Sequence, residues 1–164
     1  MTDRRELERT VRAFYRARND NDIEQIMALV DPQACFRITG NYRLGPLTHM
    51  TEGTAEISAR FGDLMTNWDV SGLDIESMHV DGDTVLVHRS GSIRFIPTDN
   101  FIDTEMLDKL TFSDGRIIEF VEFVDTLMAA EIIGFVKPSG IWTGVPGMPM
   151  EPRAARDPGS RPRA

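Results

Sequence analysis

Hydrophobic positions recur with the period of an α-helix in three segments of the first 70 residues. Residues 4–18 and a segment that begins near residue 54 each carry a stripe at i, i+4 and i+7 spacing. Between them, Asp22 is placed to cap a short helix over residues 23–30, which Pro32 ends. The stripes consist of Leu7, Val11, Phe14 and Arg18 in the first helix and of Ile57, Phe61, Leu64 and Trp68 in the third.

The rest of the pattern is typical of strands. Alternating apolar and polar residues predict one strand before the third helix and four after it, with tight turns at Asp81-Gly82 and Asp114-Gly115. A short apolar helix at about 127–134 closes the domain. Helices followed by an antiparallel meander indicate an α+β fold, a cone in which a curved antiparallel sheet wraps around three N-terminal helices. The expected strands span residues 34–39, about 70–80, 84–95, 101–112 and 116–125.

Composition divides the chain into one domain, residues 1–136, and a tail, residues 137–164. The tail holds six of the nine prolines, so we expect it to be mostly irregular, with the apolar stretch around Trp142 able to cover a pocket. The net charge is −8, and because the tail contributes +3, the domain carries −11. Such an acidic domain repels phosphate backbones, which argues against nucleic-acid binding.

The termini and the cysteine content point to a cytoplasmic protein. The first ten residues are highly charged and lack the apolar stretch of a signal peptide. No apolar run approaches the roughly 20 residues of a membrane span. The single cysteine, Cys35, permits no internal disulfide and fits a reducing compartment.

Asp108 stands out because strand alternation places a carboxyl group on an apolar face. One face of 103–112 is mostly polar, whereas the face of Asp108 also carries Met106, Leu110 and Phe112. A carboxyl group on the core side needs a partner or a proton. Asp108 is therefore either a buried acid satisfied by local hydrogen bonds or an acid whose raised pKa suits proton donation.

The turn at Asp114-Gly115 sets the register of the last hairpin. A two-residue loop pairs Asp108 with Val121 and Thr104 with Asp125, which puts Phe123 and Asp125 on the core side. The two acids would then lie about 13 Å apart, at two ends of one small ligand. A three-residue loop with a bulge would instead shift this register by one residue and turn Asp125 outward.

The opposite face of the last strand is also largely apolar and carries Ile118, Phe120, Glu122 and Val124. A small domain with a sheet that is apolar on both sides usually buries the second side against another copy. We therefore expect a homodimer formed through the outer face of the sheet.

The order of elements, together with the ending F-S-D-G-R-I-x-E-F-x-E-F-x-D-T, resembles the nuclear-transport-factor-2-like cone. More narrowly it resembles the SnoaL-like branch, which includes polyketide cyclases, ketosteroid isomerase and limonene epoxide hydrolase. The resemblance covers about residues 5–134. It implies the cone fold, and it leaves the reaction open because the fold hosts several activities.

Comparison with ketosteroid isomerase implies a role for Asp108. The stretch L-D-K-L-T-F-S-D-G-R-I resembles the strand whose neutral aspartic acid donates a hydrogen bond to a developing enolate. The proton-shuttling aspartate of that enzyme would fall near Ile38, and its tyrosine near Phe14, next to Tyr15. Because the acid at Ile38 is missing, the familiar steroid isomerisation is not expected.

Comparison with the epoxide hydrolase implies a pair formed by Arg89 and Asp125, two members of its Asp-Arg-Asp triad. Gly91 replaces the first aspartate, and Phe36 and Ile38 replace the water-holding residues. The pair is either catalytic or a structural ion pair between strands.

The expected function is acid–base chemistry without a cofactor or metal, such as isomerisation, dehydration or aldol-type cyclisation, on a small, largely apolar carbonyl compound. A non-catalytic dimeric module that binds a small ligand or a partner, and an epoxide hydrolase with a rearranged triad, are the alternatives. No His, Asp and Glu spacing suggests a metal site. The candidate catalytic residues are Asp108, Asp125, Arg89, Tyr15 and His49. The candidate substrate-binding residues are Phe14, Phe36, Ile38, Phe61, Met106, Phe123 and Trp142.

Overall fold

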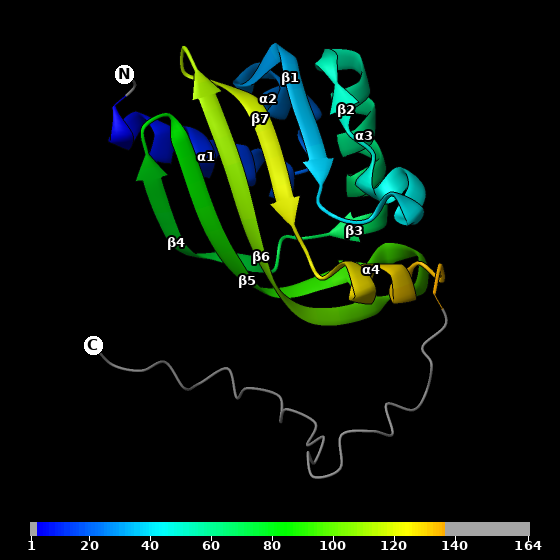
Figure 1. Cartoon of the computed structure of the whole chain (residues 1–164). Coiled ribbons are helices and arrows are strands. Elements are labelled where there is room, and N and C mark those ends of the chain that lie inside the picture. The colour runs from blue at the N-terminus through cyan, green and yellow to red at the C-terminus, as the bar shows by residue number, and fades with distance from the viewer. Residues whose placement is uncertain (1–2, 137–164) are drawn as a thin grey trace, which may run out of the picture.

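A computed structural model, which describes residues 3–136, contains three N-terminal helices, a curved sheet and a closing helix (Figure 1). The α+β prediction is confirmed. None of the helices within these residues is both long and apolar enough to cross a membrane. The helices are α1 (Arg4–Asn19), α2 (Ile23–Leu29), α3 (Gly53–Asn67) and α4 (Thr126–Ile132). The strands are β1 (Val30–Ile38), β2 (Thr51–Glu52), β3 (Trp68–Asp69), β4 (Leu73–Asp81), β5 (Thr84–Phe95), β6 (Asn100–Ser113) and β7 (Arg116–Phe123).

Aspartate side chains cap the starts of α1, α2 and α4. The carboxylate of Asp22 accepts a hydrogen bond from the amide of Gln25 at 2.9 Å, so the predicted start of α2 is confirmed. The strand after α2 is longer than expected, since β1 already begins at Val30 and contains Pro32.

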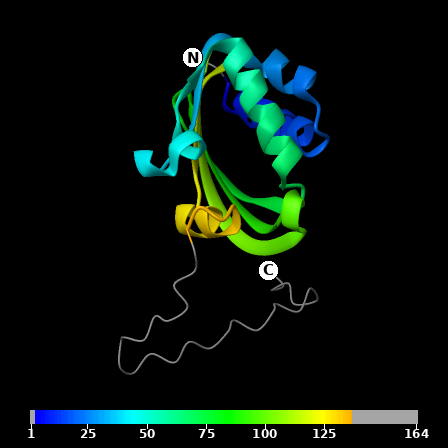
Figure 2. The ribbon, with the colours of Figure 1, turned by 90° about the vertical axis from the view of Figure 1, so that its right-hand side faces the viewer.

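The sheet is ordered β2-β1-β7-β6-β5-β3, with β4 also paired to β5. All pairs are antiparallel except β1 with β7, which is parallel, so the expected all-antiparallel sheet is wrong at this one position. The helices α1 to α3 lie on one side of the sheet, and the long strands β5 and β6 curl beneath them toward α4 (Figure 2).

Glycine permits a close backbone approach at this bend. Gly91 has a φ of 145°, and a Cβ atom there would lie 2.1 Å from the carbonyl oxygen of Gly72. The position therefore requires glycine, so that β5 can turn while it stays paired with β4.

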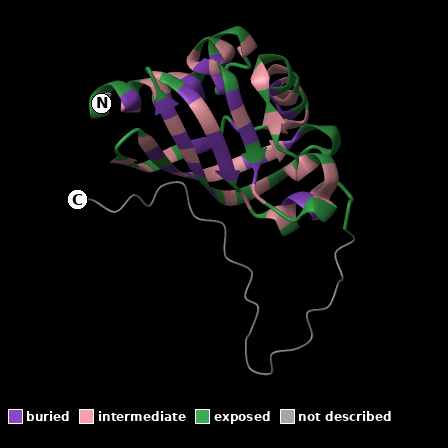
Figure 3. Ribbon diagram, turned by 45° about the horizontal axis from the view of Figure 1, so that its top comes forward, coloured by how far each residue is buried: buried purple, intermediate pink, exposed green. Residues whose placement is uncertain are grey.

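The core fills the wider end of the cone with aromatic rings. Phe36 stacks on Phe61 and on Phe120 with ring centroids 5.0 Å and 5.1 Å apart, and Phe14 meets Phe120 edge to face at 5.2 Å. Buried residues run across the central strands of the sheet, with exposed residues at its margins (Figure 3). These rings pack against one another and fill this part of the interior.

The hairpin β6–β7 has the predicted turn but a different register. Asp114 and Gly115 both have positive φ, as a two-residue type I′ turn requires, and Ser113 pairs with Arg116. A bulge then follows, because Phe112 pairs with Ile117 while Thr111 pairs with Glu119.

The bulge leaves Ile118 as an extra residue in β7, so every later residue of the strand pairs one position further along. Asp108 faces Glu122 rather than Val121, and Leu110 faces Phe120. Because side chains alternate, Phe120 and Glu122 point into the cone, whereas Phe123 points outward and is 44% exposed. The outward placement of Phe120 and Glu122 expected from the sequence is therefore wrong.

Candidate active site

Asp108 lies on the core side of β6, as strand alternation predicted, and is fully buried. Its Oδ2 atom accepts hydrogen bonds from the Tyr15 hydroxyl at 2.6 Å and from Nε of Arg89 at 2.8 Å, and it lies 2.7 Å from Nη2 of Arg89. Its Oδ1 atom is also buried and has no hydrogen-bond partner among residues 3–136. Oδ2 therefore receives all the donors that reach this carboxyl group from residues 3–136, whereas the buried Oδ1 receives none.

Burial has the largest effect on the pKa of Asp108. Burial, opposed by the charge of Arg89, raises the pKa of Asp108 from 3.8 to about 6, and the nearby carboxylate of Glu122 contributes in the same direction. Burial and the adjacent Asp108 raise the pKa of the Tyr15 phenol well above its ordinary value, so the phenol stays a donor. Asp108 can thus exchange a proton near neutral pH.

Arg89 links Asp108 to a second buried acid. Its guanidinium stacks 4.4 Å from the ring centre of Tyr15, and Nη2 lies 3.5 Å from Oε1 of Glu122. Burial alone would lower the pKa of Arg89, but Asp108, Tyr15 and Glu122 more than offset this and raise it. Arg89 is therefore a permanent cation between two carboxyl groups.

Glu122 also forms an ion pair with Arg18 of α1, and both side chains are at most 5% exposed. Arg18 Nη1 and Arg89 Nη2 both donate to the same oxygen, Oε1. Both of these hydrogen bonds go to Oε1, and none within residues 3–136 goes to Oε2 of Glu122, whose side chain is only 1% exposed and lines the pocket described next. Two arginines thus fix this carboxylate while one of its oxygens stays available.

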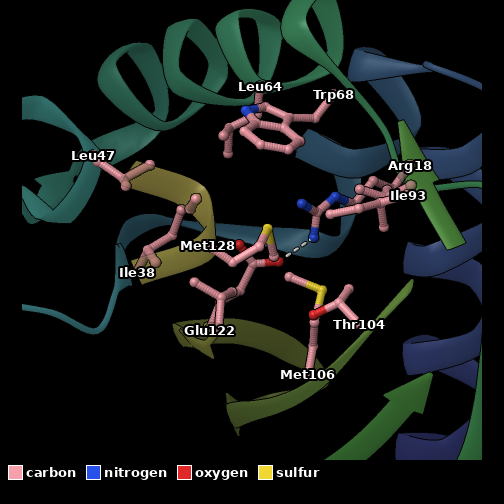
Figure 4. A pocket seen from close by; sticks show the side chains of 13 residues that line it. Arg18, Ile38, Leu47, Leu64, Trp68, Ile93, Thr104, Met106, Glu122 and Met128 are labelled. Atoms are coloured by element: carbon pink, nitrogen blue, oxygen red, sulfur yellow. Dashed lines mark hydrogen bonds and ion pairs between the residues drawn. The ribbon is translucent and has the colours of Figure 1, made fainter. Parts of the chain in front are cut away.

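Arg18 and Glu122 form the polar part of a pocket at the open end of the cone. The pocket holds about 510 Å³ of empty space, including space open to solvent. In Figure 4 the two side chains meet among Trp68, Met106 and Met128. The lining is otherwise apolar except for Thr104, and it comprises Arg18, Ile38, Leu47, Leu64, Trp68, Val70, Ile93, Thr104, Met106, Glu122, Val124, Met128 and Ala129.

Two candidate catalytic residues lie away from this pocket. Asp125 is exposed and caps α4, where its Oδ1 accepts the amide hydrogen of Met128 at 3.0 Å. The prediction that Asp125 faces the ligand is wrong, because the bulge in β7 reverses the face of every residue beyond it. His49 is exposed at the end of the 3₁₀ segment Tyr42–Thr48 and does not line the pocket. Arg89 keeps its predicted carboxylate partnership, but with Asp108 in place of Asp125.

The predicted substrate-binding residues divide into three groups. Ile38 and Met106 line the pocket. Three aromatic residues belong instead to the packed core, around a smaller cavity of about 210 Å³, and Phe123 faces outward, so these four assignments are corrected. Trp142 lies outside the described residues. The three core residues are Phe14, Phe36 and Phe61.

Sequence reasoning missed Glu122 and Arg18 as site residues. Glu122 was assigned to the outer face because nothing in the alternation of β7 announces the bulge. The position of Arg18, however, could have been used to predict a buried partner, since Arg18 continues the apolar stripe of α1. A charged residue on such a stripe needs a buried partner of opposite charge.

The structure also explains the departure from the epoxide hydrolase pattern at Gly91. A side chain at this position would collide with the backbone of Gly72, so no acid fits there. Asp108 on the neighbouring strand supplies the carboxylate to Arg89 instead. Asp108 does not line the pocket, however, so this acid–arginine–acid set does not present its first acid to a ligand.

Comparisons with known proteins agree with this architecture. Residues 11–120 match the family model of the SnoaL-like domain, which is more than half of the chain, and the protein therefore belongs to the SnoaL-like domain family. A search of curated proteins finds no match to this chain.

Three solved structures illustrate the likeness. A proposed isomerase from Bacillus subtilis is 20% identical with a TM-score of 0.73, and the match covers 83% of this chain and 98% of that one. A proposed SnoaL-like polyketide cyclase from Jannaschia sp. CCS1 is 19% identical with a TM-score of 0.66, covering 80% and 96%. An LEH-like epoxide hydrolase from M. tuberculosis is 17% identical with a TM-score of 0.61, covering 79% and 96%. At these identities the likeness shows the shared cone fold alone.

Proposed function

We propose that this protein is an enzyme that moves a proton at a carbon atom next to a carbonyl group in a small, largely apolar molecule. The observation that carries the proposal is the arrangement of Glu122. Its Oε1 is held by Arg18 and Arg89, while Oε2 has no partner among the described residues and its side chain lines an apolar pocket.

Glu122 Oε2 is the general base in this proposal. A carboxylate in a pocket with few competing donors can accept a proton from the α-carbon of a bound carbonyl compound. The same oxygen can return the proton at another carbon, which gives isomerisation, or the carbanion can attack or expel a group, which gives cyclisation or dehydration.

Arg18 is placed to stabilise the negative charge that develops on the carbonyl oxygen. Its guanidinium has five N–H donors, and only one nitrogen is engaged by Glu122 within residues 3–136. The remaining donors belong to a side chain that lines the pocket. A fixed cation in a water-poor pocket stabilises an enolate more strongly than water does.

The test is deuterium exchange from D2O into the α-positions of 2-tetralone, acetophenone and 4-phenyl-2-butanone, followed by NMR. Glu122→Gln should slow exchange about 10²- to 10⁴-fold, the usual range for losing a general base. Glu119→Gln is the matched control, because Glu119 lies on the same strand and pairs with Lys109 outside the pocket. Exchange by the wild type no faster than by Glu122→Gln would favour the non-catalytic ligand-binding module.

We further propose that the protein is a homodimer formed through the outer face of the sheet, with residues different from those first expected. Leu107 and Phe123 are neighbours in the β6–β7 register, and they are 39% and 44% exposed. Leu86 on β5 adds a third exposed apolar side chain on the same face. Burial of this face against a second copy would remove apolar surface from water.

A further inference from the structure

Five polar side chains form one buried network below the pocket. The net charge of this network depends on whether Asp108 is protonated. The five side chains comprise two arginines, two carboxylic acids and one phenol, and each is at most 5% exposed. The network is neutral when both acids are ionised and carries one positive charge when Asp108 holds a proton. Its members are Tyr15, Arg18, Arg89, Asp108 and Glu122.

The position for this proton is visible in the hydrogen bonding of Asp108. Its Oδ2 receives the donors of Tyr15 and Arg89, whereas its buried Oδ1 has no partner within residues 3–136. An ionised oxygen without a donor is costly in a dry environment, and a proton on Oδ1 removes that charge. The geometry thus permits Asp108 to change its charge without breaking any of the hydrogen bonds to Oδ2.

Asp108 is connected to the pocket only through its neighbours. Arg18 and Glu122 line the pocket, whereas Asp108 and Arg89 do not. Arg89 Nη2 lies 2.7 Å from Asp108 Oδ2 and 3.5 Å from Glu122 Oε1, so the two acids share one cation. A ligand that brings negative charge to Arg18 places a third anion in a network with two buried cations.

We propose that anionic ligands bind this pocket together with one proton, which Asp108 takes up. The ligand class is the aromatic or alicyclic carboxylates and phenolates, whose charge resembles that of an enolate intermediate. This inference rests on the pocket being the reaction site proposed above, but not on the reaction itself. Proton uptake keeps the number of negative charges equal to the number of buried arginines.

The other titratable groups around Asp108 and Glu122 are not expected to take up the proton that accompanies ligand binding. Tyr15 and Arg18 face the network from α1, Arg89 from β5 and Glu122 from β7. Arg60 of α3 adds positive charge near Glu122, and its guanidinium donates to the backbone oxygen of Leu47 at 2.7 Å. The raised pKa values of Tyr15 and Arg89 keep the protons on these two groups near neutral pH, and the experiment separates Asp108 from Glu122.

The pH dependence has a definite sign. In the free protein Asp108 has a pKa of about 6, and a bound anion raises it further. Affinity for an anion should therefore be greatest below about pH 6 and fall by up to tenfold for each pH unit above it, with uptake of up to one proton. A neutral ligand of the same shape should show neither effect.

The experiment is titration calorimetry with 2-naphthoate between pH 5.5 and 8.5, in pairs of buffers with different ionisation enthalpies. The carboxyl group of 2-naphthoate, like that of Glu, titrates near roughly 4 and stays ionised throughout. We expect uptake approaching one proton near pH 7. 2-Naphthamide, the neutral control, should bind with no proton uptake and no change in affinity across this range.

Asp108→Asn imitates the protonated state at every pH. It should bind 2-naphthoate without proton uptake. At pH 8 it should bind about 100-fold more tightly than the wild type, because wild-type affinity falls up to tenfold for each of the two pH units above the pKa of about 6. Tyr15→Phe removes a hydrogen bond that favours the ionised form, so it should move the fall in affinity to higher pH. This second variant keeps the test available if Asp108→Asn does not fold.

Three results would overturn the inference. They are proton uptake that persists unchanged in Asp108→Asn, wild-type affinity for 2-naphthoate that does not vary with pH, and no binding of 2-naphthoate at pH 5.5. Uptake that disappears in Glu122→Gln but not in Asp108→Asn belongs to the first result and assigns the proton to Glu122. Ketone exchange is measured separately, so failure of the proposed reaction would leave the result for 2-naphthoate intact and distinguishable.

Discussion

Replacing Asp108 by Asn should change how the stability of the fold depends on pH. The folded protein raises the pKa of Asp108 from 3.8 to about 6, because burial outweighs the attraction of Arg89. The native state therefore binds this proton more tightly than the unfolded chain. Its contribution to stability is fully present below about pH 4 and is lost as pH rises through about 6.

The magnitude follows from the interval between the two pKa values. Each pKa unit corresponds to about 1.4 kcal/mol, so full ionisation of Asp108 should reduce the free energy of unfolding by about 3 kcal/mol, of which about 2 kcal/mol is lost between pH 4 and pH 7. Asn does not titrate and should not show this loss. The difference in unfolding free energy, variant minus wild type, should thus rise by about 2 kcal/mol over this range.

Urea denaturation followed by circular dichroism at several pH values measures this difference. Protein concentration must be held constant, because dimerisation would otherwise alter the apparent stability. Asp125→Asn is the matched control, since Asp125 is an exposed helix cap and Asn caps helices equally well. A difference that falls between pH 4 and pH 7 would mean that the native state favours ionised Asp108, and it would refute the reasoning.

Three further predictions concern the rest of the fold. Glutamate at Leu107 and Phe123 together should convert a dimer to a monomer in sedimentation experiments, and a monomeric wild type would contradict the proposed interface. Asp125→Ala should lower the unfolding free energy in urea by about 1 kcal/mol through loss of the cap, and no change would show that the cap is dispensable. Gly91→Ala should lower it by about 2–4 kcal/mol, because Cβ would meet the oxygen of Gly72 at a positive φ; an unchanged midpoint would contradict this.

The sequence was sufficient for the inward direction of Asp108 and for the turn of the last hairpin. Strand alternation alone placed Asp108 with Met106 and Leu110, and all three are buried. The residues Asp114 and Gly115 specify a two-residue turn because both adopt positive φ. These features are local, so a single sequence contains the information.

The bulge at Ile118 could not be predicted in the same way. One extra residue reverses the faces of the rest of β7, and β7 has apolar residues on both sides, so neither register violates the pattern. As a consequence, Glu122 points into the cone and Asp125 points outward, the reverse of what the sequence predicted. Arg18 on the apolar stripe of α1 favours the true register, because it requires a buried acid near its end of the cone.

The central claim is that Glu122, rather than Asp108 or Asp125, exchanges protons with a ligand. The most direct test is the rate of α-deuteration of 2-tetralone by three purified variants, Glu122→Gln, Asp108→Asn and Asp125→Asn. We predict that Glu122→Gln loses at least about 100-fold in rate, whereas Asp125→Asn keeps the wild-type rate. A Glu122→Gln protein that deuterates the ketone as fast as the wild type would contradict the account.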